Sequence, residues 1–221
     1  MTVITQEENL GAFEDKLRNY GIIPVVKIED ADDAVPLAAA LSDAGLSCAE
    51  ITFRTSAAGE AIKRIKNAFP DFFVAAGTVL QKDQVESAVT SGAELIVAPG
   101  FNDDIVSYCI NRDIRIIPGV ATPSEIEKAS YIGLDTVKLF PAEILGGPAY
   151  IKAVSAPYSH MKFMPTGGIN KNNLKDYLSL KNVVCCGGSW FVKSNVIASH
   201  DFEMIKNETA EAVRIVKEAG R

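Results

Sequence analysis

The sequence predicts an α/β protein in which eight parallel strands alternate with helices and close into a (β/α)8 barrel, the TIM-barrel fold. The first observation is length, because 221 residues suit one barrel domain covering residues 1–221. The second is a series of eight short apolar runs whose first residues are 21 to 26 positions apart. Each interval has room for one strand, one helix and two short loops, which favours a closed parallel barrel over an open sheet.

The predicted strands are the apolar runs themselves. They cover residues 22–27, 48–53, 72–76, 94–98, 115–118, 136–140, 161–165 and 183–186. Before the first of them, residues 6–20 predict an additional helix. We expect this helix to plug the floor of the barrel, at the amino ends of the strands.

Two of the connecting segments carry clear helix signals. Residues 32–45 begin with acidic side chains, alternate Ala and Leu with polar positions, and stop at Gly45, a typical C-terminal glycine. A second helix begins at Thr122, which suits an N-cap because Pro123 follows at the first helical position. Glu125 stands three residues after that cap, which completes a capping box.

Composition and charge exclude several classes of protein. Hydrophobic residues make up 48% and charged residues 23%, as in a globular protein, and the net charge of −6 comes without a basic run, so we expect no nucleic acid partner. No apolar run approaches the ~18 residues of a membrane span. The start of the chain, residues 1–9, is polar and acidic and does not resemble a signal peptide. We therefore expect a cytoplasmic protein.

Cysteine and histidine usage argues against a metal site. The four cysteines are Cys48, Cys109, Cys185 and Cys186. None forms a C-x-x-C pair, so they are interpreted as buried apolar side chains in a reducing compartment. The two histidines, His160 and His200, are too few for a His-rich metal centre. Nucleotide-binding glycine motifs are missing too, and we expect neither a metal nor an organic cofactor.

The second predicted strand carries polar residues on one face. Side chains alternate along a strand, so Glu50, Thr52 and Arg54 face away from the apolar positions between them. If the apolar set packs on helices, a carboxylate and a guanidinium lie inside the barrel near its carboxyl-terminal mouth. Barrel enzymes hold their catalytic residues there. The alternative is a buried Glu–Arg pair with a purely structural role.

Lys138 stands within the sixth predicted strand, among apolar neighbours. Burial disfavours a charged ammonium, so an inward lysine can supply a neutral amine nucleophile. The alternative is a structural pair with Glu50. Lys162 is the rival lysine within a strand, but it lies at the amino end, where barrels keep residues that stabilise the fold. Lys27 lies at the mouth end of the first strand and suits a solvated position.

A glycine pair follows each of the last two predicted strands. Gly167 and Gly168 follow the seventh, and Gly187 and Gly188, with Ser189, follow the eighth. The loops after strands seven and eight form the phosphate site of many barrels, where backbone N–H groups bind the anion. The two pairs together predict a phosphate-binding site.

These residues make the family recognisable. The sequence resembles the 2-keto-3-deoxy-6-phosphogluconate (KDPG) aldolases, also called 4-hydroxy-2-oxoglutarate (KHG) aldolases, over nearly its whole length. The stretches that carry the resemblance are Glu50–Thr55, Ala76–Leu80, Ala98–Gly100, Ile117–Val120, Val137–Glu143, Pro165–Ile169 and Gly187–Trp190. Phe53 and Ala98 depart from the usual Leu and Ser, and neither change removes a reactive group.

The resemblance implies a role for each candidate residue. Lys138 becomes the lysine that forms a Schiff base, Glu50 the acid and base, and Arg54 and Thr78 the groups that hold the carboxylate of the pyruvyl unit. Further pocket residues are expected at Pro99, Phe140 and Thr166, and the phosphate is assigned to Gly167, Gly168, Gly188 and Ser189. It also implies a homotrimer, which composition alone does not indicate.

The activity implied is cleavage of KDPG to pyruvate and glyceraldehyde 3-phosphate, with KHG as a second substrate giving pyruvate and glyoxylate. Preference among KDPG, its galacto epimer and KHG stays open, because these substrates differ by one stereocentre or by the phosphate tail. Two alternatives come from other classes. One is an isomerase or decarboxylase of the ribulose-phosphate type, which shares the phosphate site but needs no imine-forming lysine. The other is a barrel without catalytic activity.

Overall fold

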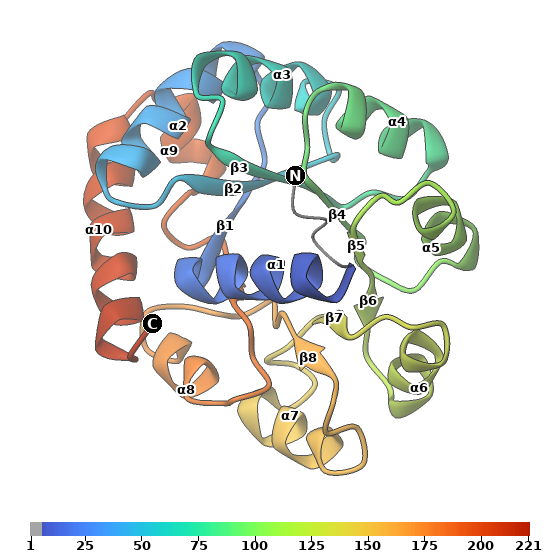
Figure 1. Ribbon diagram of the computed structural model, residues 1–221. Helices are drawn as coiled ribbons and strands as arrows, with labels where there is room; N and C mark the ends of the chain where they lie inside the picture. Colours follow the sequence, from blue (N-terminus) through green and yellow to red (C-terminus); the bar gives the residue numbers. More distant parts are fainter. Residues whose placement is uncertain (1–5) are drawn as a thin grey trace.

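The computed structural model describes residues 6–221 as an α/β fold whose short central strands all pair in parallel (Figure 1). Residues 1–5 lie outside the described residues. They are the first part of the polar start that, by sequence, does not resemble a signal peptide. The strands are β1 (Ile22–Val26), β2 (Cys48–Thr52), β3 (Phe73–Gly77), β4 (Leu95–Val97), β5 (Ile116–Ile117), β6 (Gly119–Val120), β7 (Thr136–Leu139), β8 (Lys162–Phe163) and β9 (Cys186–Gly188).

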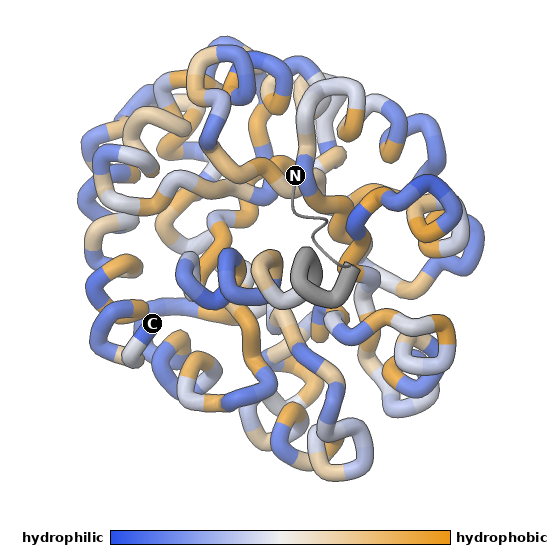
Figure 2. Tube along the Cα trace, in the orientation of Figure 1, coloured by the Kyte–Doolittle hydropathy of each residue, from blue (hydrophilic) through white to orange (hydrophobic). Residues whose placement is uncertain are grey.

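Helices surround the strands. They are α1 (Gln6–Tyr20), α2 (Ala34–Asp43), α3 (Ala58–Ala68), α4 (Lys82–Thr90), α5 (Asp103–Ile110), α6 (Pro123–Tyr131), α7 (Gly147–Ser155), α8 (Leu174–Leu178), α9 (Ser194–Ala198) and α10 (Phe202–Glu218), with a 3-10 turn, η1, at Ala31–Asp33. Hydrophobic residues concentrate on the central strands, while hydrophilic segments lie toward the periphery (Figure 2). Buried side chains from strands and helices form one continuous cluster.

The strands form two curled parallel sheets. The larger has the order β5-β4-β3-β2-β1-β9 and the smaller the order β6-β7-β8. Two isolated parallel bridges, Phe163 with Val183 and Thr166 with Gly187, relate the β8 side of the smaller sheet to the β9 side of the larger. The predicted parallel α/β class is therefore confirmed.

Two strands differ from the sequence prediction. The fifth predicted strand, 115–118, is interrupted: β5 pairs with β4, β6 pairs with β7, and Pro118, which has no N–H to donate, lies between them. The eighth, 183–186, lies later in the chain. Val183 forms only an isolated bridge, and the strand proper begins at Cys186, which pairs with Ile22 of β1.

The helix signals are confirmed. The capping box at α6 forms on both sides, with the Thr122 hydroxyl accepting from the Glu125 N–H and the Glu125 carboxylate accepting from the Thr122 N–H. After α2, Gly45 has a φ of +86°, a left-handed conformation that glycine adopts without steric cost.

Helix α1 lies across the amino ends of the strands, as Figure 1 shows with the helix crossing in front of the sheet. Phe73, the first residue of β3, contacts α1 twice, with ring centroids 6.1 Å from Phe13 and 5.7 Å from Tyr20. The Arg115 guanidinium, next to β5, lies 4.8 Å from the Phe13 ring. The helix predicted before the first strand is therefore present, and it covers the amino ends of the strands, where we expected it.

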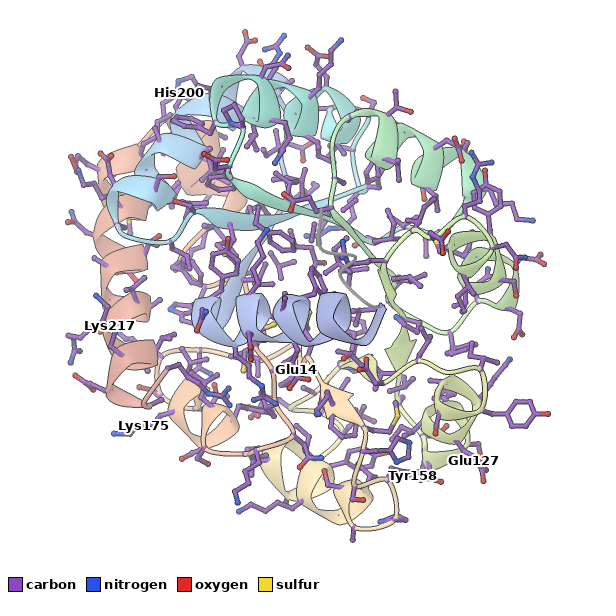
Figure 3. All side chains as sticks on the ribbon, viewed as in Figure 1. Glu14, Glu127, Tyr158, Lys175, His200 and Lys217 are labelled. Carbon is purple, nitrogen blue, oxygen red and sulfur yellow. The ribbon has the colours of Figure 1, made fainter. Side chains whose placement is uncertain are left out.

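Charged side chains fasten the same helix. Lys16 Nζ lies 2.9 Å from a Glu94 carboxylate oxygen immediately before β4, and Lys162 Nζ of β8 lies 3.4 Å from Glu14. Figure 3 shows Glu14 on the side of α1 that faces β8.

Within residues 6–221, no helix is both long enough and apolar enough to span a bilayer.

Candidate functional site

A buried lysine and a buried glutamate meet between the two sheets. Glu50 stands in the middle of β2 and Lys138 in β7. Lys138 Nζ donates to Glu50 Oε1 at 3.1 Å and lies 3.4 Å from Oε2. Glu50 is 0% and Lys138 4% exposed, so the pair is removed from bulk water. The inward orientation that strand alternation predicts for both side chains is confirmed.

Backbone pairing fixes the lysine's strand. The Lys138 N–H donates to the Pro118 carbonyl at 2.9 Å, and Lys138 is in register with Gly119 of β6. Its strand neighbours Val137 and Leu139 are both fully buried in the apolar core. Because those two side chains face the helices, Lys138 is directed to the interior.

Thr52 and Arg54 continue the same face of β2 toward its carboxyl end. The Thr52 hydroxyl donates to the Val26 carbonyl at 2.7 Å and accepts from Arg54 Nε at 3.1 Å. Arg54 is exposed, and no carboxylate within residues 6–221 pairs with it. The sequence predicts its face but not its depth. At this strand end, its guanidinium has unused donors for an anion.

Thr78 follows β3 directly and has an unusual backbone. Its φ is +55°, in the left-handed region that β-branched residues rarely adopt. The residue is half-buried at the carboxyl end of the strand. Such outliers cluster at functional sites, where surrounding structure holds them in place.

Phe140 and Pro99 flank the lysine strand. The Phe140 ring centroid lies 5.8 Å from Lys138 Nζ, and the ring is 38% exposed. Pro99 follows β4, and its carbonyl approaches Gly119 of β6 so closely that a Cβ atom there would overlap it. Phe140 thus lies beside the Lys138 amine, whereas Pro99 lies against Gly119, the β6 residue in register with Lys138.

The two glycine loops lie side by side. Gly167 and Gly168 have φ values of +97° and +83°, and the bridge between Thr166 and Gly187 joins their loop to the last strand. The space above Gly167 is bounded by the Phe140 ring, 3.3 Å from where its Cβ would lie. The Thr166 hydroxyl is buried without a hydrogen-bond partner in the described part of the chain.

The last glycine loop differs in exposure along its length. Gly188 is buried and ends β9, whereas Ser189 is exposed immediately after it. The structure therefore brings the loops of Gly167–Gly168 and Gly188–Ser189 to one edge, at the carboxyl ends of β8 and β9.

The rival lysines lie elsewhere. Lys162 pairs with Glu14 at the floor, as its place in the strand predicts, and Lys27 pairs with Glu29 at the surface. Neither amine is buried as Lys138 is.

Three further residues lie near the buried pair or the Gly168 loop, and sequence reasoning assigned none of them a role in the site. Burial, together with the charge of Glu50, raises the pKa of Cys185 to about 12, so this thiol stays protonated and is no rival nucleophile. Tyr177, fully buried, donates to Glu143 behind the Gly168 loop, and burial followed by that contact raises its pKa. A buried cysteine and tyrosine carry no sequence signal of what they neighbour.

Two cavities lie outside this arrangement. One, of about 570 Å³, is a polar hollow between α3 and α4; the other, of about 610 Å³, lies at the amino ends of β4, β5 and β7. Neither is lined by Glu50 or Lys138. The candidate site is therefore the buried Glu50–Lys138 pair and not either of the two cavities.

The fold and the pair together define the class: a parallel α/β protein that holds an amine and a carboxylate side by side in a dry interior. The family described as KDPG and KHG aldolase matches residues 13–208. A 2-dehydro-3-deoxy-phosphogluconate aldolase of Haemophilus influenzae is 47% identical over 203 residues, covering 92% of this chain and 96% of the relative. The KHG/KDPG aldolase of Escherichia coli is 37% identical over 204 residues, covering 92% and 96%.

A solved structure agrees with these relatives. The KDPG aldolase of Legionella pneumophila, with pyruvate captured as a covalent carbinolamine intermediate, superposes with a TM-score of 0.86 at 37% identity, covering 90% of this chain and 97% of that one. This chain belongs to the KDPG and KHG aldolase family.

Proposed function

We propose that this protein is a carbon–carbon lyase that cleaves KDPG to pyruvate and glyceraldehyde 3-phosphate through a Schiff base on Lys138. The observation that carries the proposal is the amine of Lys138, 4% exposed and 3.1 Å from the Glu50 carboxylate. Relatives at 37–47% identity bear KDPG aldolase names, and one similar structure holds pyruvate as a carbinolamine. Both facts support the assignment.

The first step forms the imine. The neutral Lys138 amine attacks the C2 ketone, and the carbinolamine loses water to give a protonated imine. Because Nζ already donates to Glu50, the carboxylate is within reach of the proton that the amine releases. The positive imine nitrogen then serves as the electron sink.

The second step breaks the C3–C4 bond. Glu50, directly or through a water, takes the proton of the C4 hydroxyl; the C3–C4 electrons move toward the imine and give an enamine, and the aldehyde leaves. Protonation of the enamine at C3 and hydrolysis of the imine then release pyruvate and restore the amine. No electron acceptor outside the substrate is required by this sequence.

The carboxylate of the substrate and the pocket around the Glu50–Lys138 pair are assigned to different residues. Arg54 offers a planar pair of donors that matches a carboxylate, and the Thr78 hydroxyl adds a hydrogen bond to it. Pro99, Phe140 and the unpartnered hydroxyl of Thr166 are proposed to line the pocket. These assignments place the pyruvyl carboxylate at the ends of β2 and β3.

The phosphate is assigned to the glycine loops, through Gly167, Gly168, Gly188 and Ser189. Left-handed φ values at Gly167 and Gly168 support this, because consecutive glycines let backbone N–H groups turn toward an anion. The binding energy of the distant phosphate would then orient the reacting carbons.

We further propose that the two sheets are parts of one closed eight-stranded barrel forming a single domain. Support comes from the two isolated bridges beside β9, from the interruption at Pro118, and from the Glu50–Lys138 pair that joins β2 of one sheet to β7 of the other.

We also propose that the protein is a cytoplasmic homotrimer. Tyr131 and Ile144, 91% and 85% exposed, are apolar side chains that an assembly would cover. Sedimentation velocity measures that state.

The test is reductive trapping. Pyruvate with cold borohydride should inactivate the protein irreversibly and add the mass of a reduced pyruvyl group to Lys138. An isomerase of the ribulose-phosphate type or an inactive barrel would acquire no such adduct, which would reject the proposal. Kinetics with KDPG, its galacto epimer and KHG then decide among substrates.

A further inference from the structure

Gly77 lies beside the carboxylate of Glu50. It ends β3, and the register of β2 with β3 sets Glu50 against Ala75 and Thr52 against Gly77. Paired residues of parallel strands share a face, so Gly77 faces the interior with Glu50. Side chains in strands also lean along the strand direction, and in this structure the Glu50 side chain extends past Ala75 to Gly77.

The carboxylate occupies the place that a side chain at residue 77 would need. A Cβ atom there would lie 2.5 Å from Glu50 Cγ and 2.6 Å from Cδ, and it would overlap Oε1. Contacts under 3.0 Å essentially never occur for real Cβ atoms. Any residue except glycine therefore moves the carboxylate from its position against Lys138.

Backbone conformation does not explain this glycine. Gly77 is not among the residues with positive φ, unlike Gly167 and Gly168, so its φ does not prevent alanine. The requirement at residue 77 is for space rather than for backbone freedom.

We propose that Gly77 is a positioning residue: by lacking a side chain it leaves the space in which Glu50 is held against the Lys138 amine. The catalytic consequence rests on the proposed aldolase function, whereas the steric one does not. Gly77 acts only through Glu50 and contacts no reacting atom.

The kinetic test compares Gly77→Ala with Glu50→Gln. The alanine variant should lose roughly 10²–10⁴-fold in kcat for KDPG cleavage, the scale of a lost general acid or base, with a small change in KM. Pyruvate should still be trapped on Lys138 by borohydride. When Gly77→Ala is added to Glu50→Gln, the further loss should be at most about twofold, since the two changes disable the same group.

Two results would overturn the proposal: cleavage by Gly77→Ala close to that of the unaltered protein, or losses that multiply in the double variant. A matched control is Gly59→Ala in α3, where the new Cβ would lie 2.7 Å from the Ser87 hydroxyl, at the end of another flexible side chain. It should leave cleavage and trapping unchanged.

A stability measurement is independent of the reaction. In Glu50→Ala the atoms that would overlap are gone, so Gly77→Ala should lower Tm much less in that background than in the unaltered protein. Equal Tm shifts in the two backgrounds would reject the steric claim, even if Gly77→Ala alone were too unstable for kinetics. If the unaltered protein fails to trap pyruvate, the proposed function fails, and this cycle still decides the role of Gly77.

Discussion

Toward the two ends of the strands lie lysine–carboxylate pairs of different kinds. At the floor, Glu94 accepts from Lys16 at 2.9 Å and from Lys66 at 3.0 Å, and its side chain is 34% exposed. In the interior toward the mouth, Glu50 is fully buried, and its carboxylate hydrogen-bonds Lys138 alone among the described residues. The floor carboxylate has two cations and water; the interior one has neither the second cation nor the solvent.

This difference in burial and in the number of partners suits the Glu94 pair to stabilising the fold and the Glu50 pair to proton transfer. Burial opposes ionisation of Glu94, but hydrogen bonds and charges from Lys16 and Lys66 outweigh it and lower the pKa of that carboxyl. Such a pair is satisfied and contributes modestly to folding. A dry pair with one partner is costly to bury, and keeping it suits a group that exchanges protons with a substrate.

The largest effect should come from removing the buried amine. Lys138→Ala should lose more than roughly 10⁴-fold in kcat for KDPG cleavage, because no imine can form. Lys138→Arg should be equally inactive, since a guanidinium stays protonated. Lys66→Ala at the floor is the control and should keep both cleavage and the borohydride adduct. An adduct that persists in Lys138→Arg would transfer the role to another lysine, with Lys162 examined next.

The carboxylates of the two ends can be compared directly. Glu50→Gln keeps the shape but cannot accept a proton, so cleavage should fall roughly 10²–10⁴-fold while part of the pyruvate adduct survives. Glu94→Gln makes the same chemical change at the floor and should leave turnover unaltered. Steady-state kinetics with both variants measure the contrast, and equal turnover in the two would remove the distinction between the ends.

The glycine loops predict a smaller effect that depends on substrate. Ser189→Ala should lose roughly ten- to a hundredfold in kcat/KM on KDPG, the worth of one hydrogen bond to a charged group. A bulkier residue at Gly168 should cost more, because its Cβ would meet Glu143 Cγ at 2.5 Å and its φ is +83°. Both variants should act nearly normally on KHG, which has no phosphate. Equal losses on the two substrates would mean that the loops only shape the mouth.

The smallest effect concerns stability at the floor. The pKa of Glu94 is lowered from 4.5 by folding, so its stabilisation is present above 4.5 and is lost as pH falls through the lower folded value. Denaturant unfolding at pH 7 and near pH 3 should show Glu94→Gln destabilised by about 1 kcal/mol or less at pH 7, given solvent screening, and by less in acid. A difference that grew in acid would contradict this account.

Sequence periodicity predicts strands well where apolar residues alone define them. The runs at 22–27, 48–53 and 136–140 contain β1, β2 and β7 with the same first residues. It fails at Pro118, because a proline inside an apolar run interrupts a ladder without changing hydropathy. It also fails for the run at 183–186, because the strand there begins only at Cys186, which pairs with Ile22 of β1, far away along the chain.

The site, like the strands, combines features that the local sequence determines with features that depend on residues far away in the chain. Strand alternation is a local property, so it predicts the inward direction of Glu50 and Lys138 from the sequence. The exposure of Arg54 depends on which loops cover the mouth, and alternation carries no information on that. The role inferred for Gly77 is an empty volume, which becomes visible only when the position of Glu50 is known.

Helix α1 has a consequence for how such a protein can change. Its contacts with Phe73, Glu94 and Lys162 all lie at the amino ends, on residues that take no part in the proposed reaction. The loops to which we assign substrate binding lie at the opposite ends of the strands, so substitutions in them leave these contacts of α1 intact. A library for altered specificity is therefore best confined to the segments after β3, β8 and β9, with residues 6–20 kept constant, because a loss of the α1 contacts would add to the destabilisation that most substitutions cause.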